Sequence, residues 1–157
     1  MKYLLITIIY ILNIYLIYDI FCNKKSIEYY TPKEYNYVHD TLYKNLKKSI
    51  DIFENHDIKY WATAGTLLGC IRDKKIIDHD DDIDLGMMEK DYDLLLNCIK
   101  EENELFQEFK NAGLHLLENP APWSQIKILT YRDDGDYTKN RIFIDICKFE
   151  KKNDKYE

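Results

Sequence analysis

Carboxylates crowd one short stretch of this chain. Residues 80–85 read Asp-Asp-Asp-Ile-Asp-Leu, so four acidic side chains fall within five positions. Like charges this close raise one another's pKa, and a divalent cation removes the cost of ionising them together. Mg²⁺ is commonly held by one or two carboxylates together with substrate phosphates. The stretch therefore favours a metal site for a phosphate-bearing substrate, with Asp82 and Asp84 as the ligands.

A third aspartate strengthens this interpretation. Asp145 lies within the apolar run Ile-Phe-Ile-Asp-Ile-Cys at residues 142–147, where an unpaired charge would be costly to bury. On a strand beside the one that carries Asp82 and Asp84, it would complete a metal site of three carboxylates. The alternative is a buried aspartate that is satisfied by a backbone or hydroxyl donor.

A glycine-containing turn precedes the acidic stretch. Residues 65–69 read Gly-Thr-Leu-Leu-Gly. Gly65 would let backbone N–H groups approach a phosphate without a Cβ in the way, and the helix that follows would present its positive end to the same anion. Thr66 could add a hydroxyl donor, and Arg72 could make bidentate contacts to phosphate oxygens. Taken alone such a turn commonly just links a strand to a helix, and the acidic strand nearby favours phosphate binding.

The acidic stretch does not fit a calcium-binding EF-hand loop, and two other residues have alternative roles. An EF-hand requires oxygen ligands at loop positions 1, 3 and 5 and glycine at position 6, and every starting point from Asp78 to Asp81 places Ile83 or Leu85 at one of these positions. His79 could act as a base or ligand, although a loop role is the simpler assignment. Trp123 could stack on a base or a sugar, or fill the core.

The elements that must position these residues follow from hydrophobic periodicity and from turn signals. Thr31, Pro32 and Glu34 form a capping box that opens a helix. The pattern then predicts strands at 58–64, 82–87 and 114–117, helices at 66–72 and 89–101, and an antiparallel hairpin of 125–131 and 141–149 around the acidic loop 133–136. This order predicts an α/β (α+β) fold, a mixed sheet flanked by helices.

The length, composition and charge of the chain favour a single folded domain and argue against a disordered or nucleic-acid-binding protein. At 157 residues the chain suits one folded domain, and an aromatic content of 14% argues against disorder. The net charge of −6 is concentrated near the acidic stretches, so we expect no nucleic-acid partner. The four cysteines form no C-x-x-C pair or zinc pattern and are predicted to be free, buried thiols; they are Cys22, Cys70, Cys98 and Cys147.

The N-terminal residues differ from the rest of the chain. Residues 4–20 are nearly all Ile, Leu and Tyr, close to the length that spans a bilayer. We predict a signal-anchor or transmembrane helix at residues 1–22, a linker at 23–31 and the folded domain at 32–157. A cleavable signal peptide and a buried or interfacial helix are the alternatives. Lysines flank both ends of the run, so the charge rule leaves its orientation open.

Two motifs resemble the LicD family, which includes bacterial phosphocholine transferases and the eukaryotic fukutin and fukutin-related proteins. They are Tyr-Trp-Ala-Thr-Ala-Gly-Thr-Leu-Leu-Gly-Cys-Ile-Arg at 60–72 and Asp-His-Asp-Asp-Asp-Ile-Asp-Leu-Gly-Met at 78–87. The likeness is good over about residues 50–95 and looser around Asp145. His79 stands where the family usually has tryptophan, and Cys70 where it commonly has alanine.

The resemblance implies a nucleotidyltransferase-like fold and a transfer that depends on Mg²⁺ or Mn²⁺. A phospho-alcohol of the phosphocholine or ribitol-phosphate type would move from a CDP-activated donor to a glycan or glycoconjugate acceptor. By position, the family's catalytic and metal-binding residues correspond to Asp82, Asp84 and Asp145, and its donor-phosphate contacts to Gly65, Thr66 and Arg72.

The resemblance also implies a place in the cell, and it leaves two other functions open. Many family members act in the secretory pathway behind an N-terminal anchor, so we expect a single-pass membrane protein with a lumenal catalytic domain. One alternative is a general nucleotidyltransferase that acts on a nucleoside triphosphate. The other is a truncated, inactive remnant that still binds metal, because the sequence ends twelve residues after Asp145.

Overall fold

The computed structural model describes residues 31–119, 125–131, 142–152 and 155–156. The predicted anchor at 1–22, most of the linker, Cys22, Trp123 and the acidic loop at 133–136 lie outside these ranges. Within the described ranges, no helix combines the length and the apolarity that crossing a bilayer requires.

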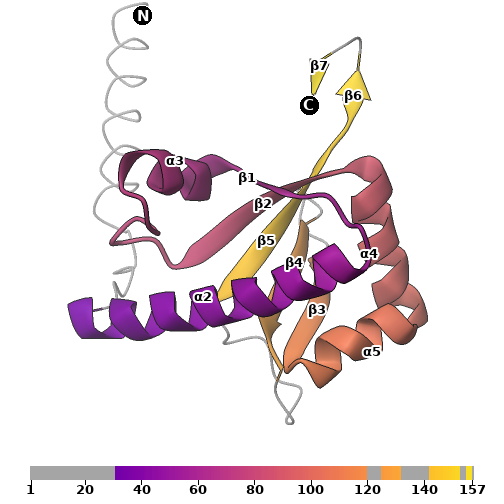
Figure 1. The fold of residues 1–157 in the computed structure, drawn as a ribbon, viewed down its shortest axis with the longest axis horizontal. Coiled ribbons are helices and arrows are strands. Elements are labelled where there is room, and N and C mark those ends of the chain that lie inside the picture. Colours follow the sequence, from indigo (N-terminus) through magenta and orange to yellow (C-terminus); the bar gives the residue numbers. More distant parts are fainter. Residues whose placement is uncertain (1–30, 120–124, 132–141, 153–154, 157) are drawn as a thin grey trace, which may run out of the picture. The chain divides into compact units, whose positions relative to one another are not determined.

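A five-stranded mixed sheet forms the centre of the fold (Figure 1). Its strand order is β1-β2-β5-β4-β3, with β2 and β5 parallel and the other pairs antiparallel. The strands are β1 (Trp61–Ala62), β2 (Asp82–Met88), β3 (Leu114–Asn119), β4 (Gln125–Thr130) and β5 (Phe143–Phe149). A separate two-stranded sheet joins β6 (Lys151–Lys152) to β7 (Lys155–Tyr156). The predicted mixed α/β fold is confirmed.

Alternation along the central strands separates an apolar face of the sheet from a charged one. Side chains of a strand point to opposite faces in turn. The buried residues on one face are Ile83 and Leu85 of β2, Ile144 and Ile146 of β5, and Ile126 and Ile128 of β4. Asp82, Asp84 and Asp145 occupy the alternate positions, so the apolar core on one face holds the acidic residues in place on the other.

Helix α2 (Pro32–Asn55) crosses the sheet and begins at the predicted capping box. The Thr31 hydroxyl accepts from the Glu34 N–H at 3.4 Å, and the Glu34 carboxylate accepts from the Thr31 N–H at 2.6 Å. The buried side of α2 is mixed rather than purely apolar. Asn45, a buried side chain, donates to the Thr130 hydroxyl at 3.0 Å, which ties α2 to the end of β4.

Helix α4 (Glu89–Glu101) has the predicted bounds, whereas α5 (Glu104–Asn111) was not predicted. Glu102 adopts a left-handed conformation that separates the two helices. The side chain of Asn103 then caps α5 by accepting from the Phe106 N–H. A helix of eight residues is too short for a clear periodic signal, and the fold stabilises it by burying Leu105 and Phe109.

Helix α3 (Ala64–Arg72) begins two residues earlier than predicted, which shortens the preceding strand to β1. Its outer surface is apolar: Leu67, Leu68 and Ile71 are 43%, 49% and 65% exposed. Cys70 also lies on the surface, so the prediction of a buried thiol is wrong there, whereas Cys98 is buried as predicted. The cysteines within the described residues form no disulfide.

Candidate metal centre and active site

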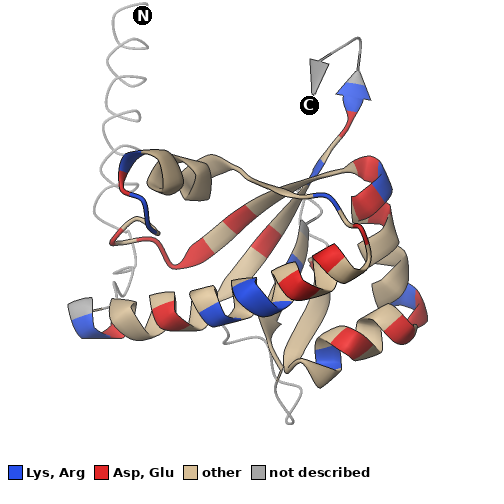
Figure 2. Ribbon diagram, in the orientation of Figure 1, with Lys and Arg blue, Asp and Glu red and all other residues tan. Residues whose placement is uncertain are grey.

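Three carboxylates from two strands converge on the charged face of the sheet. Asp82, Asp84 and Asp145 each offer an oxygen, and these oxygens all lie within 4.8 Å of one another. The parallel pairing of β2 with β5 is the cause, because it sets Asp84 directly opposite Asp145. Acidic residues interrupt both neighbouring strands in Figure 2. The structure therefore brings together the three carboxylates that the sequence predicted to share a site.

Burial and mutual repulsion raise the pKa of two of these carboxylates, Asp82 and Asp84. The pKa of Asp82 rises from 3.8 to about 7, first because burial removes water from the carboxylate. Repulsion adds to this effect and comes from Asp84, Asp80, Asp145 and Asp81. Mg²⁺ and Mn²⁺ prefer carboxylate oxygens as ligands. A bound divalent ion would also favour the ionised form of these carboxylates.

The pKa of Asp84 is also raised, again chiefly by burial and then by repulsion from Asp145 and Asp80. Two groups oppose the shift: a hydrogen bond from the backbone N–H of Gly65, and the charge of Lys127. These two contacts favour the ionised form of Asp84, which is the form that binds a metal ion.

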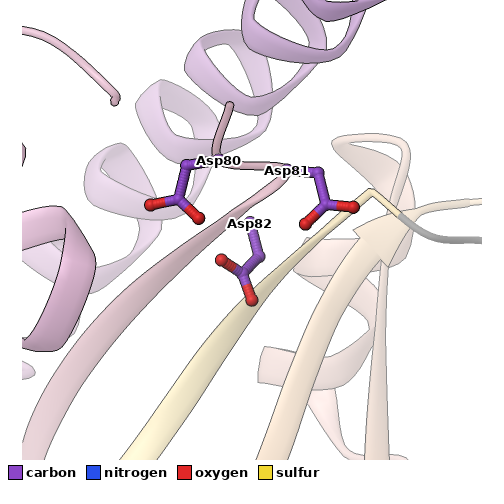
Figure 3. Close-up of side chains that lie close together, drawn as sticks. All are labelled: Asp80, Asp81 and Asp82. Atoms are coloured by element: carbon purple, nitrogen blue, oxygen red, sulfur yellow. The ribbon is translucent and has the colours of Figure 1, made fainter. Parts of the chain in front are cut away.

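Asp80 and Asp81 lie beside this centre, in the loop that leads into β2. With Asp82 they form a second group of oxygens within 4.8 Å, and Figure 3 shows the three side chains gathered there. Exposed acidic groups often gather without an ion, and both residues are partly exposed. Their evident effect is electrostatic, since each raises the pKa of Asp82.

The N-terminal end of α3 is hydrogen-bonded to β2. The Thr66 hydroxyl accepts from the Asp84 N–H at 2.8 Å, and the Thr63 N–H donates to the Asp84 carbonyl at 3.1 Å. Gly65 lies so close to the acidic loop that a Cβ there would be 2.9 Å from an Asp80 carboxylate oxygen. Gly65 and Thr66 thus contact β2 and the loop that leads into it, and their contacts to donor phosphate remain a prediction.

Arg72 lies at the other end of α3. Its guanidinium donates to both carboxylate oxygens of Asp73, at 2.8 and 2.6 Å. It lies seven positions after Gly65 in the same helix, a rise of about 10 Å along the helix axis. The structure therefore does not gather Arg72 with the Gly65–Thr66 turn. His79 is exposed and lines the same surface pocket as Arg72.

Lys127 was not predicted, although it is the residue most closely joined to Asp145. Its Nζ lies 2.8 Å from Asp145 Oδ1, and the two side chains are 18% and 10% exposed. The same Nζ lies 3.3 Å from the centre of the Phe143 ring. The available signal was a single lysine between two isoleucines, Ile126 and Ile128, which are both buried.

Two residues of α2, which the sequence did not indicate, form hydrogen bonds with the segment that leads into β2. His39 Nε2 lies 2.9 Å from the carbonyl oxygen of Asp80, and the Tyr43 hydroxyl accepts from the Ile76 N–H at 3.0 Å. The local sequence of α2 does not predict these contacts, because the partner residues lie 41 and 33 positions away in the chain. They become visible only when α2 is packed on the sheet.

Comparison with known proteins gives a family match and two curated relatives. The model of the family "LicD/FKTN/FKRP, nucleotidyltransferase domain" matches residues 57–157. The uncharacterized protein RT0683 of Rickettsia typhi is 43% identical over 79 residues, covering 50% of this chain and 23% of the relative. The uncharacterized protein RP689 of Rickettsia prowazekii is 43% identical over 51 residues, covering 32% and 19%. The matches thus span less than a quarter of either relative.

Among solved structures, the antibiotic-resistance factor ANT(2'')-Ia is similar with a TM-score of 0.47 and 14% identity. The match covers 76% of this chain and 52% of that one. A TM-score below 0.5 does not establish a shared fold, so the assignment rests on the family model. That model covers more than half of the chain and includes all six predicted site residues. The chain therefore belongs to the LicD/FKTN/FKRP nucleotidyltransferase-domain family.

Proposed function

We propose that this protein is a metal-dependent phosphotransferase that moves a phospho-alcohol from a CDP-activated donor to a glycan or glycoconjugate acceptor. The phospho-alcohol would be of the phosphocholine or ribitol-phosphate type. One observation carries the proposal: Asp82, Asp84 and Asp145 converge within 4.8 Å on neighbouring strands of a LicD-family domain. Membership of this family supports a transferase with a nucleotidyltransferase-like domain. The donor and acceptor classes go beyond family membership and are part of the proposal.

The residues present fit a divalent ion. Each of the three carboxylates offers an oxygen at close range, and the pKa of Asp82 is raised by burial and then by repulsion from the neighbouring aspartates. Asp82, Asp84 and Asp145 would hold Mg²⁺ or Mn²⁺ together with oxygens of the donor phosphates. When bound, the ion would neutralise charge that develops on the phosphoryl oxygens and the leaving group.

The remaining groups of the site would bind and orient the donor. The acceptor hydroxyl oxygen would form a bond to the phosphorus of the phospho-alcohol while the bond from that phosphorus to CMP breaks, so that CMP leaves with the electron pair. Asp145 is the candidate acceptor for the hydroxyl proton. The Thr66 hydroxyl accepts from Asp84 and keeps its own hydrogen for a phosphate oxygen. Arg72 would have to leave Asp73 to reach the donor.

We also propose that residues 1–22 anchor the protein in a membrane, with the domain at 32–157 lumenal and residues 23–31 as the linker. The support is the long apolar run in the sequence. Extraction of cell membranes with alkali should leave the full chain in the pellet, and protease added outside sealed vesicles should spare the domain. Release into the alkaline supernatant would contradict an anchor and agree with a cleaved signal peptide.

Product analysis tests the reaction. The protein would be incubated with Mg²⁺ or Mn²⁺ and, separately, CDP-choline, CDP-ribitol, ATP or CTP, with and without a glycan mixture. We expect CMP from a CDP-alcohol, lost on chelation and in Asp84→Asn. The matched control is Asp78→Asn, because Asp78 is exposed and pairs with Lys75 outside the centre. Pyrophosphate released from a nucleoside triphosphate would contradict the donor class, and no product from any donor would favour an inactive remnant.

A further inference from the structure

Lys127 is the residue outside the predicted site whose contacts bear most directly on its chemistry. It lies on β4 directly opposite Asp145 in the antiparallel register of β4 and β5. The 2.8 Å contact between its Nζ and Asp145 Oδ1 is mostly shielded from water. The Phe143 ring flanks the ammonium at 3.3 Å from the ring centre, a favourable position for a cation over an aromatic face. The ammonium is therefore fixed at the edge of the carboxylate cluster.

The charge balance of the cluster gives this lysine a role. The carboxylates of Asp82, Asp84 and Asp145 carry three negative charges when ionised, and among the described residues Lys127 is the one cation with an ion pair to any of them. A divalent ion bound by the same carboxylates would supply the positive charge that Lys127 supplies without it. The two cations would repel each other, because both lie within a few ångströms of Asp145.

We propose that Lys127 is a further substrate-binding residue, which compensates the carboxylates in the metal-free site and binds a diphosphate oxygen once a divalent ion is present. The inference rests on the proposed function only in taking a diphosphate as the group that accompanies the ion. An ammonium is a strong donor to phosphate oxygens. In this arrangement the metal and the diphosphate bind together better than either binds alone.

The distances make the exchange of partners feasible. Oxygens at adjacent positions around one Mg²⁺ lie about 3 Å apart, since each Mg–O bond is about 2.1 Å. A phosphate oxygen bound next to Asp145 would lie within reach of Lys127, whose Nζ already contacts Asp145 Oδ1 at 2.8 Å. A small rotation of the flexible lysine side chain, with no movement of β4, would be enough to change partner.

Two binding constants measured by titration calorimetry at pH 8 test this role, with Mn²⁺ and inorganic pyrophosphate as probes. In Lys127→Met, which removes the charge and keeps most of the length, we expect Mn²⁺ alone to bind roughly tenfold more tightly, because a repelling charge is lost. Pyrophosphate in the presence of saturating Mn²⁺ should bind on the order of tenfold more weakly, because a phosphate contact is lost. Lys127→Arg should stay close to the wild type in both measurements.

The opposite signs separate this role from a purely structural one, which predicts that both affinities fall together. The matched control is Lys148→Met. Lys148 is a partly buried lysine of β5 that pairs with Glu89 at 3.0 Å and Asp93 at 3.3 Å, and its loss should change neither constant. Unchanged or weaker Mn²⁺ binding in Lys127→Met would overturn the charge-compensating role. Unchanged pyrophosphate binding would overturn the phosphate contact.

Two further measurements cover a variant that does not fold. Lys127→Gln, which keeps a hydrogen-bond donor for Asp145, should show the same pair of opposite changes. A structure of the wild-type protein with Mn²⁺ and pyrophosphate should place Lys127 Nζ within about 3 Å of a phosphate oxygen, and an Nζ that contacts only Asp145 would refute the proposal. Because pyrophosphate carries no nucleoside, these tests can succeed even if CDP-alcohols prove not to be donors.

Discussion

Asp82 is the residue at which the electrostatics of the centre can be measured most directly. Its carboxyl group is half-buried and is repelled by Asp80, Asp81 and Asp84, all within two positions in the sequence, and by Asp145 on the neighbouring strand. Its pKa in the folded protein is about 7, against an ordinary value of 3.8. The folded metal-free protein therefore binds a proton that the unfolded chain releases over that interval of pH.

This difference predicts how stability depends on pH when metal is removed. In the presence of a chelator, the free energy of unfolding should fall as pH rises from about 4 to about 7, because the unfolded chain then binds fewer protons at Asp82 than the folded protein does. Asp82→Asn should flatten that part of the curve. Urea midpoints of both proteins at several pH values provide the measurement. Parallel curves for the two would show that Asp82 is not perturbed.

Thr66 links the first turn of α3 to β2. Thr66→Val keeps the shape of the side chain but leaves the Asp84 N–H, which it accepts from at 2.8 Å, without that partner. We expect a loss of about 1–2 kcal/mol in the free energy of unfolding and weaker Mn²⁺ binding, because the backbone at Asp84 is less firmly held. Thr66→Ser, which restores the hydroxyl, is the control, and it should recover both. A valine variant with wild-type stability and metal affinity would contradict this role.

At the scale of elements, α2 does more than cover the sheet. It lies outside the part of the chain that the family model matches, which begins at residue 57. Nevertheless, His39 and Tyr43 hold the segment that leads into β2 through backbone contacts at 2.9 and 3.0 Å. We therefore expect the position of the acidic stretch to depend on α2.

Removal of the His39 contact tests this dependence. His39→Ala should weaken Mn²⁺ binding several-fold and lower the free energy of unfolding by about 1 kcal/mol, because the Asp80 carbonyl loses its partner on α2. The control is His56→Ala at the end of the same helix, where His56 pairs with Glu108 at 2.6 Å on the surface. Equal effects of the two variants on metal affinity would show that α2 does not position the acidic loop.

The sequence predicted those elements whose hydrophobic residues repeat with a clear strand or helix period. β2 and α4 follow from alternation and from helical spacing, and their bounds agree with prediction to within a residue. The strand expected at 58–64 was too long because α3 starts at Ala64, whose φ of +42° is not readable from residue type. α5 was missed because eight residues carry little periodic signal.

At the scale of the whole molecule, the site joins segments that are distant in sequence. Residue types alone marked Asp82, Asp84 and Asp145 as partners, since a lone aspartate in an apolar strand calls for a cation or a donor. The parallel register that sets Asp84 opposite Asp145 is a property of the assembled sheet. Lys127 and His39 likewise acquire partners only through strand order and helix packing. The gathering of the three carboxylates was therefore predictable from the sequence, whereas the contacts made by Lys127 on β4 and His39 on α2 were not.

We propose that two separate strands, β2 and β5, hold one divalent ion through Asp82, Asp84 and Asp145. The most direct measurement is the calorimetric affinity of the wild-type protein, Asp145→Asn and Asp78→Asn for Mn²⁺. Asp145 lies on β5, away from the acidic stretch of sequence, whereas Asp78 lies near that stretch but is exposed and paired with Lys75. We predict one Mn²⁺ site in the wild type, at least about tenfold weaker binding in Asp145→Asn because a charged ligand is lost, and unchanged binding in Asp78→Asn. Wild-type affinity in Asp145→Asn would contradict a shared metal centre.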